Sequence, residues 1–251
     1  MQTLFHDDKR TRPPVRRLWD EAMSAATPLP RRVILAAARA APTGDGHPVL
    51  LVPGFLRGEG YMKPLQRFLG HRGYAVYGWR LGVNLGPTER ALDGLERRLA
   101  EIVAREGRRV TLIGHSLGGA FARELAKQRP QDVRQLIVLA SPIRLPTASQ
   151  LEPIYRMLAR WHSPNSSSLY AGLNEPPEVP VTALYTRRDG IVAWQSCLES
   201  EGPARQNIEV KGAHSTMARS PAAWRIIADR LAQPEGQWRP YGAGRGQNSA
   251  S

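Results

Sequence analysis

Three polar residues, Ser116, Asp189 and His214, each follow a predicted strand. A serine hydroxyl at its ordinary pKa is a weak nucleophile. It needs a base within hydrogen-bond reach and a third group that orients the base. In the chain order Ser, Asp, His, these residue types can supply the nucleophile, the orienting acid and the base. The pattern therefore predicts nucleophilic catalysis of acyl transfer, with Ser116 attacking a carbonyl carbon.

Ser116 lies in a Gly-x-Ser-x-Gly turn between the β-branched run at 110–113 and a predicted helix at 120–128. The motif alone is weak, because glycine accounts for 23 of the 251 residues. The strand, turn and helix around it are the context in which a serine is held on a strained turn with its hydroxyl exposed. The alternative is a serine that merely caps the helix. A cap, however, does not require a flanking pair of glycines.

His214 is the favoured base among six histidines, because its loop follows the last predicted strand and precedes the last predicted helix. His115 is adjacent to the serine and is expected to point elsewhere. The other four lie in the N-terminal arm, before a strand, at a helix end or in a proline-rich insertion: His6, His47, His71 and His162. A lone loop histidine is often simply exposed, so the prediction depends on the joint order of all three residues.

Asp189 is favoured over Asp132 as the orienting acid. These are the only aspartates between Ser116 and His214. Asp189 directly follows a predicted strand, whereas Asp132 precedes one and belongs to the opposite edge of the sheet. The glutamates of this interval fall in helices, in the insertion or within a strand. An Asp-Gly pair in a loop also forms ordinary turns, which is the alternative for Asp189.

Two backbone N–H groups are needed to stabilise the oxyanion that forms during acyl transfer. Leu117, directly after the serine, supplies one. The other is expected from Phe55, because Gly54 lets the chain after the strand at 49–52 turn in closely, with Leu56 as the reserve. The alternative is that Pro53-Gly54 is only a turn.

Strands alternate with helices along the chain, which predicts an α/β fold with a mostly parallel sheet and helices on both faces. The expected strands are 49–52, 74–79, 110–113, 135–140, 179–186 and 206–211. The expected helices are 16–26, 31–40, 61–72, 87–105, 120–128, 151–161 and 221–231, with Pro87 at a first helical position. Ligands bind beyond the carboxyl ends of such strands.

The predicted domain organisation has three parts. Residues 1–45 form an N-terminal arm rich in proline, whose role the sequence does not reveal, and residues 46–233 form one catalytic domain. Within that domain, residues 143–178 form a short insertion that could act as a minimal lid. Residues 234–251, rich in glycine and polar groups, are expected to be a disordered tail.

Composition restricts the partners. The formal net charge of +13 comes from dispersed arginines, which favours a basic surface with nonspecific contact to anionic surfaces over specific nucleic-acid binding. Cys197 is the only cysteine, so no intramolecular disulfide can form. No signal peptide or membrane-spanning run is seen, and we expect a cytoplasmic protein. The oligomeric state is not predicted.

The segments 52–55, 114–119, 185–192 and 212–214 together resemble the α/β-hydrolase superfamily, in its small lipase and esterase branch, over residues 49–231. The resemblance implies an α/β-hydrolase fold and cleavage of small-molecule or lipid-like carboxylic esters. It also implies that Ser116, His214 and Asp189 act through an acyl-enzyme intermediate, with no metal and no cofactor.

Two features differ from many relatives. The oxyanion turn carries Pro53-Gly54 where His-Gly is common, which removes a side-chain donor but keeps the backbone. The insertion is shorter than a full cap domain, so an open site suited to bulky or interfacial esters is expected. A thioesterase, amidase or acyltransferase would use the same three residues. A non-catalytic binding protein on a hydrolase scaffold is the alternative from another class.

Overall fold

The computed structural model describes residues 12–26, 29–144, 147–164 and 172–242. Six strands form one sheet in the order β2-β1-β3-β4-β5-β6, and every neighbouring pair is parallel. The strands are β1 Pro48–Val52, β2 Ala75–Gly78, β3 Val110–His115, β4 Val133–Leu139, β5 Val181–Tyr185 and β6 Arg205–Glu209. The predicted α/β class and parallel sheet are confirmed.

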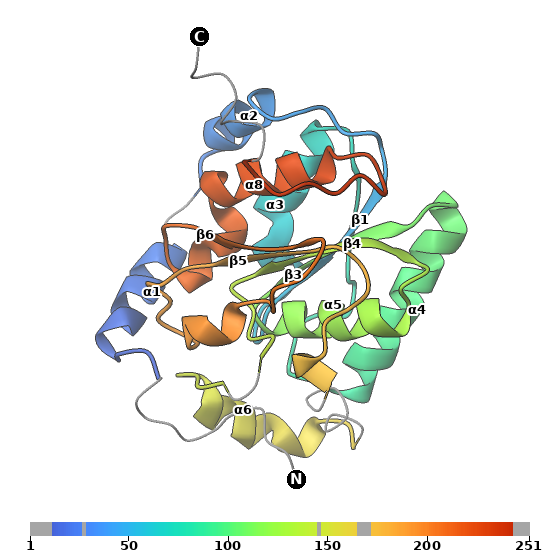
Figure 1. Cartoon of the computed structure of the whole chain (residues 1–251). Helices are drawn as coiled ribbons and strands as arrows, with labels where there is room; N and C mark the ends of the chain where they lie inside the picture. The colour runs from blue at the N-terminus through green and yellow to red at the C-terminus, as the bar shows by residue number, and fades with distance from the viewer. Residues whose placement is uncertain (1–11, 27–28, 145–146, 165–171, 243–251) are drawn as a thin grey trace.

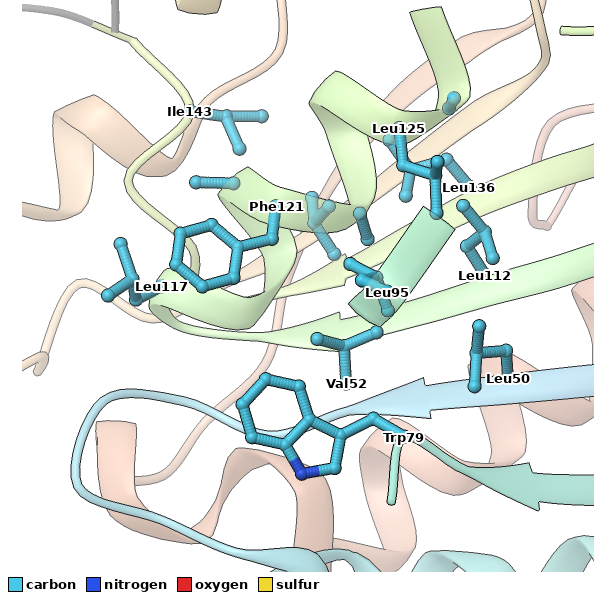
Figure 2. Packing of buried hydrophobic residues seen from close by; sticks show 14 of the residues in the cluster. Leu50, Val52, Trp79, Leu95, Leu112, Leu117, Phe121, Leu125, Leu136 and Ile143 are labelled. Atoms are coloured by element: carbon cyan, nitrogen blue, oxygen red, sulfur yellow. The ribbon is translucent and has the colours of Figure 1, made fainter. Parts of the chain in front are cut away.

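Helices cover both faces of the sheet (Figure 1). On one face lie α2 (Arg31–Arg39), α3 (Glu59–His71) and α8 (Pro221–Leu231), and on the other α4 (Glu89–Glu106) and α5 (Leu117–Gln128). Alternate residues of β1 belong to the two cores, with Leu50 and Val52 in the core under α4 and α5. Figure 2 shows part of that core, where Leu95 and Phe121 pack with these strand residues. A sheet buried on both faces explains why its central strands read as continuous apolar runs.

The sheet has a topological switch point next to β1. The chain passes from β1 to β2 on one side and then crosses to β3 on the other, so β1 lies between them. In open parallel sheets a ligand crevice forms where the connections diverge, at the carboxyl ends of the strands. Here that place is bordered by the residues that follow Val52 and His115.

The start of α4 differs from the prediction. Pro87 is not its first helical residue; the helix begins at Glu89, and Thr88 is the cap. The Thr88 hydroxyl accepts the N–H of Ala91 at 3.1 Å, which fixes the first turn two residues later than the proline indicated.

The remaining helical segments lie before α2 or after β4 in the chain. They are α1 (Arg16–Ala26), α6 (Glu152–Leu158) and the short 3-10 turns η1 (Ala159–Trp161), η2 (Gly172–Asn174), η3 (Trp194–Cys197) and η4 (His214–Arg219). Both helices predicted in the N-terminal arm are therefore present. Part of the arm, at 1–11 and 27–28, and part of the insertion, at 145–146 and 165–171, lie outside the described residues.

Residues 234–242, which belong to the expected disordered tail, contact the edge of the sheet at one point. Tyr241 donates its N–H to the Gln206 side chain at 2.6 Å and packs against the core on the α8 side. The last part of the expected tail, 243–251, lies outside the described residues. Across the described residues, no helix has the length and apolar character needed to cross a membrane.

Candidate active site

Ser116 occupies a strained turn between β3 and α5. Its φ of 53° and ψ of −128° are conformations that residues with side chains rarely adopt. Both flanking glycines are required by close approach. A Cβ on Gly114 would lie 2.4 Å from the Gly119 Cα, and one on Gly118 would lie 2.4 Å from the Pro53 oxygen. The Ser116 side chain makes no capping hydrogen bond to α5, which contradicts the alternative that it is only a helix cap.

Asp189 and His214 are brought together from two separate loops. The Asp189 Oδ2 lies 2.7 Å from the His214 Nδ1. The other carboxylate oxygen, Oδ1, accepts the N–H groups of Ile191 and Val192 at 2.8 Å each. Both side chains are at most 5% exposed. These bonds fix the direction of the carboxylate, which in turn fixes the imidazole with its Nδ1 occupied.

The pKa of His214 is raised above its ordinary value of 6.5. Burial acts to lower it, but the negative charge of Asp189 and the hydrogen bond to that carboxylate raise it by more, with a further contribution from Glu21. A buried imidazole next to a carboxylate is therefore well suited to accept a proton.

Ser116 and His214 line one cavity of about 380 Å³. Its wall also includes Leu18 of α1 and Phe55 after β1. The cavity lies at the switch point between β1 and β3. The structure thus places Ser116 and His214 on one surface, at the carboxyl ends of the strands, which is the edge predicted from the sequence.

The competing histidines and Asp132 lie elsewhere. His47 pairs with Asp45 and contacts the Thr111 hydroxyl, before β1. His162 contacts the Leu85 carbonyl oxygen, and Asp132 pairs with Arg129 ahead of β4. His71 ends α3, and His6 lies outside the described residues.

The loop after β1 approaches the serine closely. A Cβ on Gly54 would lie 2.9 Å from the Ser116 Cβ, so the glycine permits this approach. The N–H of Leu56 donates to the Asn84 oxygen at 2.7 Å. Leu56, the reserve oxyanion donor, is thereby already engaged, and Phe55 remains the candidate beside Leu117.

Sequence comparison now places the chain in a family. Residues 49–246 match the family model described as the alpha/beta hydrolase family. The chain belongs to this family. The matched range includes the turn at 114–118 that holds Ser116, which we call the elbow. It also includes the loops of Asp189 and His214 and every strand except the first residue of β1. A search of curated proteins found no match.

Solved structures share the α/β-hydrolase fold at low sequence identity. The Bacillus licheniformis lipase BlEst2 superposes with a TM-score of 0.59 at 15% identity, covering 77% of this chain and 95% of that one. The Paleococcus ferrophilus monoacylglycerol lipase gives 0.54 at 15% identity, covering 76% and 96%. A thioesterase domain from the curacin biosynthetic pathway gives 0.50 at 15% identity, covering 75% and 92%. At such identities the likeness shows the fold alone.

In this α/β hydrolase, Glu21 of α1 is a residue that sequence reasoning missed. It is 4% exposed, and its carboxylate accepts the N–H groups of Gly190 at 2.9 Å, His214 at 2.8 Å and Ser215 at 2.7 Å. One side chain from the arm therefore joins the loop of the acid to the loop of the base. The sequence signal was only a glutamate on a short amphipathic helix, which gives no reason to expect burial.

Asn84 holds the loop after β1. It is fully buried, and its side chain donates to the Pro53 oxygen at 2.9 Å and accepts the N–H of Gly86 at 3.0 Å. Its backbone also pairs with Leu56 and Arg57. These bonds fix the segment that carries Phe55. An asparagine in a glycine-rich loop is typical of turns, so the sequence alone did not indicate this role.

His115 contacts the backbone of the loop that carries His214. Burial and the neighbouring His214 lower its pKa well below the ordinary value, so the ring is neutral near pH 7. Its Nε2 lies 3.0 Å from the His214 carbonyl oxygen, which requires a proton on Nε2 because a carbonyl only accepts. Tyr61 donates to the Ser215 oxygen at 2.9 Å. His115 was expected to point away from the site, but it lines the cavity with Ser116 and His214, and its ring centroid lies 5.0 Å from that of His214.

The described residues contain no group of three or more His, Cys, Asp or Glu side chains arranged to hold a metal ion. Cys197 is buried, and burial raises the pKa of its thiol well above the ordinary value. A buried thiol of this kind is a poor nucleophile. Ser116 lines the cavity together with His214, whereas Cys197 does not line it.

Proposed function

We propose that the protein is a serine hydrolase that cleaves carboxylic esters through Ser116, His214 and Asp189. The observation that carries this proposal is that Ser116, on a strained elbow, lines one cavity with His214, whose Nδ1 is bonded to the buried Asp189 at 2.7 Å. A serine near an oriented base is the arrangement that acyl transfer requires. Membership of the alpha/beta hydrolase family supports the assignment as a hydrolase.

In the proposed reaction, the Ser116 Oγ attacks the ester carbonyl carbon while the His214 Nε2 accepts the hydroxyl proton. The resulting oxyanion accepts hydrogen bonds from the N–H groups of Phe55 and Leu117. The C–O bond to the alcohol then breaks, and His214 returns the proton to the alcohol. In the second half of the reaction, His214 accepts a proton from water as the water attacks the acyl-enzyme. His214 then returns the proton to the Ser116 Oγ, which releases the acid and restores Ser116.

Asp189 acts through His214. Its bond to Nδ1 leaves Nε2 free to face the serine, and its charge stabilises the imidazolium that forms when the proton is transferred. The reaction in this form moves protons between protein groups, substrate and water, so the proposal includes no metal and no cofactor.

An apolar recess beside the serine supports an apolar acyl group. It is lined by Leu117, Leu151, Tyr155 and Val192 in addition to Phe55. Leu151 and Tyr155 belong to residues 143–178, which we assign as a minimal lid on a hydrolase domain at 46–233. The acyl group of a lipid-like or other small-molecule ester fits this lining better than a charged acyl group would.

Hydrolysis of p-nitrophenyl esters of increasing acyl length, each paired with the thioester of the same acid, tests the proposal. We expect ester cleavage by the wild-type protein, retained as the chain lengthens, and its loss in Ser116→Ala. No cleavage of any ester by folded protein would refute ester hydrolysis. A sharp fall with each added carbon would contradict an open site for bulky esters, and thioester cleavage without ester cleavage would assign a thioesterase.

A further inference from the structure

The exposed large apolar side chains of the described residues gather on four segments. Two segments are helical, α1 with the residue before it and α6 continuing into η1, and two are the loops at Leu56 and at 83–85. The side chains are Val15, Trp19, Met23, Leu56, Val83, Leu85, Ile154, Met157 and Trp161, which we call the apolar rim. Trp19 is 75% exposed and Met157 63%. Single exposed apolar residues need no explanation, but a set confined to a few segments marks an interaction site.

Helix α1, the loop at Leu56 and the residue before α6 border the catalytic cavity. Leu18 and Ala22 of α1 line it, as do Leu56 and Leu151, the residue before α6. The loop at 83–85 contains Asn84, which holds the segment after β1. Arg12, four residues before α1, pairs with Glu152 of α6 and so connects the chain ahead of α1 to α6. Part of the apolar rim, on α1, at Leu56 and next to Leu151, therefore lies beside the cavity that contains Ser116.

Helix α1 has two distinct faces. The inner face carries Leu18, Glu21 and Ala22 toward the cavity. The outer face carries Trp19 and Met23, which are four residues apart and so lie one turn above each other. An amphipathic helix normally buries its apolar side chains, whereas here a second apolar stripe faces outward.

The same segments carry positive charge. The exposed arginines Arg16, Arg57 and Arg160 lie on or beside them, whereas Arg156 is paired with Glu152 and Asp20 is an exposed acid of α1. The Arg160 guanidinium stands 4.5 Å from the Trp161 ring. Arginine binds phosphate oxygens in bidentate fashion, and tryptophan favours the boundary between an apolar phase and water. Apolar side chains framed by arginines are typical of elements that lie in the headgroup region of an anionic lipid layer.

We propose that the apolar rim docks the protein on an anionic lipid surface, with the outer faces of α1 and α6 in the headgroup region and the catalytic cavity open toward the lipid. The positive charge of the rim and its two tryptophans favour this occupant over a protein surface. Docking itself does not depend on the proposed function; only the delivery of a lipid-like ester to Ser116 rests on it.

Co-sedimentation of the full-length protein with vesicles tests the docking. The vesicles are phosphatidylcholine alone and an equimolar mixture of phosphatidylcholine and phosphatidylglycerol. We expect binding to the mixed vesicles to be at least about ten-fold stronger, since each arginine near an anionic surface contributes about 1 kcal/mol. Binding to neither vesicle, or equal binding to both, would overturn the proposal.

Three paired variants identify the surface. Trp19→Ser with Met157→Ser removes apolar contacts, and Arg16→Gln with Arg160→Gln removes charge from the rim. Arg39→Gln with Arg225→Gln removes the same charge from α2 and α8, which lie in the upper part of Figure 1, away from α6 at the bottom. We expect both rim pairs to weaken binding about ten-fold and the control pair to change it less than about two-fold. Equal weakening by the control pair would show nonspecific attraction to charge and would refute a docking surface.

Two further measurements distinguish docking on lipid from self-association and from failure of the proposed function. Light scattering of the lipid-free protein tests self-association, and dimerisation abolished by the Trp19→Ser and Met157→Ser pair would assign the rim to a second copy of this chain instead of lipid. Hydrolysis of a water-soluble short ester is expected to be unchanged in the rim variants. Failure of the wild-type protein to cleave that ester would refute the proposed function while leaving the vesicle result standing.

Discussion

The carboxylate of Glu21 accepts the backbone N–H of His214 at 2.8 Å, although 193 positions separate the two residues in the chain. The same carboxylate also accepts N–H groups from Ser215 and from Gly190, the residue after Asp189. A buried carboxylate that accepts three backbone N–H groups fixes the relative position of the two loops. The N-terminal arm is therefore part of the support of the site.

Replacing Glu21 with Gln is expected to lower kcat and to shift the pH profile. The Gln side chain keeps the shape but loses the charge that helps to raise the pKa of His214. The acidic limb of kcat/KM should therefore move to lower pH. The other groups facing His214 are Asp189, His115 and Arg57, which remain in place. Weakened hydrogen bonds to a buried charge should also cost about 1.5–3 kcal/mol of unfolding free energy.

Asp20→Asn is the matched control for Glu21→Gln, because Asp20 is the exposed neighbour on the same helix. It should leave both kcat and the pH profile as in the wild-type protein. If Glu21→Gln lowers the thermal midpoint but leaves the position of the acidic limb unchanged, Glu21 is a structural residue only and the positioning role is wrong.

The pH dependence of the wild-type protein follows from His214. Its neutral form accepts the serine proton, so activity is lost as the pH falls through its pKa. Because that pKa is raised above 6.5, the midpoint of the acidic limb of kcat/KM should lie above pH 6.5. A pH series with a soluble ester measures it. A midpoint clearly below 6.5 would mean that a group other than His214 limits the reaction.

Gly118→Ala is expected to destabilise the fold. The added Cβ would lie 2.4 Å from the Pro53 oxygen, which is backbone and cannot rotate away. Overpacking of this kind costs about 1–3 kcal/mol or more. The control is Gly70→Ala in α3, where no atom lies within 4 Å of the new Cβ, and which should be neutral or slightly stabilising. Equal thermal midpoints for the two variants would contradict the tight contact between the elbow and the loop after β1.

Asn84→Asp is expected to lower kcat about 10- to 100-fold with little change in KM. The substitution keeps the acceptor for the Gly86 N–H but replaces the donor to the Pro53 oxygen with a carboxylate oxygen. The loop that carries Phe55 should then lose its position relative to the oxyanion, a contact that forms only in the transition state. Steady-state kinetics on one soluble ester, together with a thermal midpoint, measures the effect. A change mainly in KM, or loss of the folded state, would contradict the prediction.

The elements that depend on local pattern could be predicted from the sequence, and those that depend on tertiary contact could not. The apolar runs of β1 and β3 and the glycines around Ser116 marked the sheet and the elbow, because strand burial and close approach leave compositional traces. The chain order of Asp189 and His214 indicated their shared edge. Glu21 and Asn84 left no such trace, since their roles arise from backbone groups far away in the chain.

Local rules also misplaced the start of α4. Pro87 satisfied the preference for a first helical residue, but the Thr88 hydroxyl provided the stronger cap. The glycine-rich composition after Pro234 indicated disorder, but Gln206 of β6 offers hydrogen bonds to Tyr241 at the edge of the sheet. At the start of α4, a single specific hydrogen bond outweighed an average preference.

Labelling with a fluorophosphonate probe tests the central claim most directly. Incubation of the folded full-length protein, followed by mass spectrometry of its peptides, should find one adduct, on Ser116. Labelling should vanish in Ser116→Ala and should slow strongly in His214→Ala, whose thermal midpoint is measured alongside. A folded wild-type protein that takes no label, or an adduct that persists in Ser116→Ala, would contradict the account.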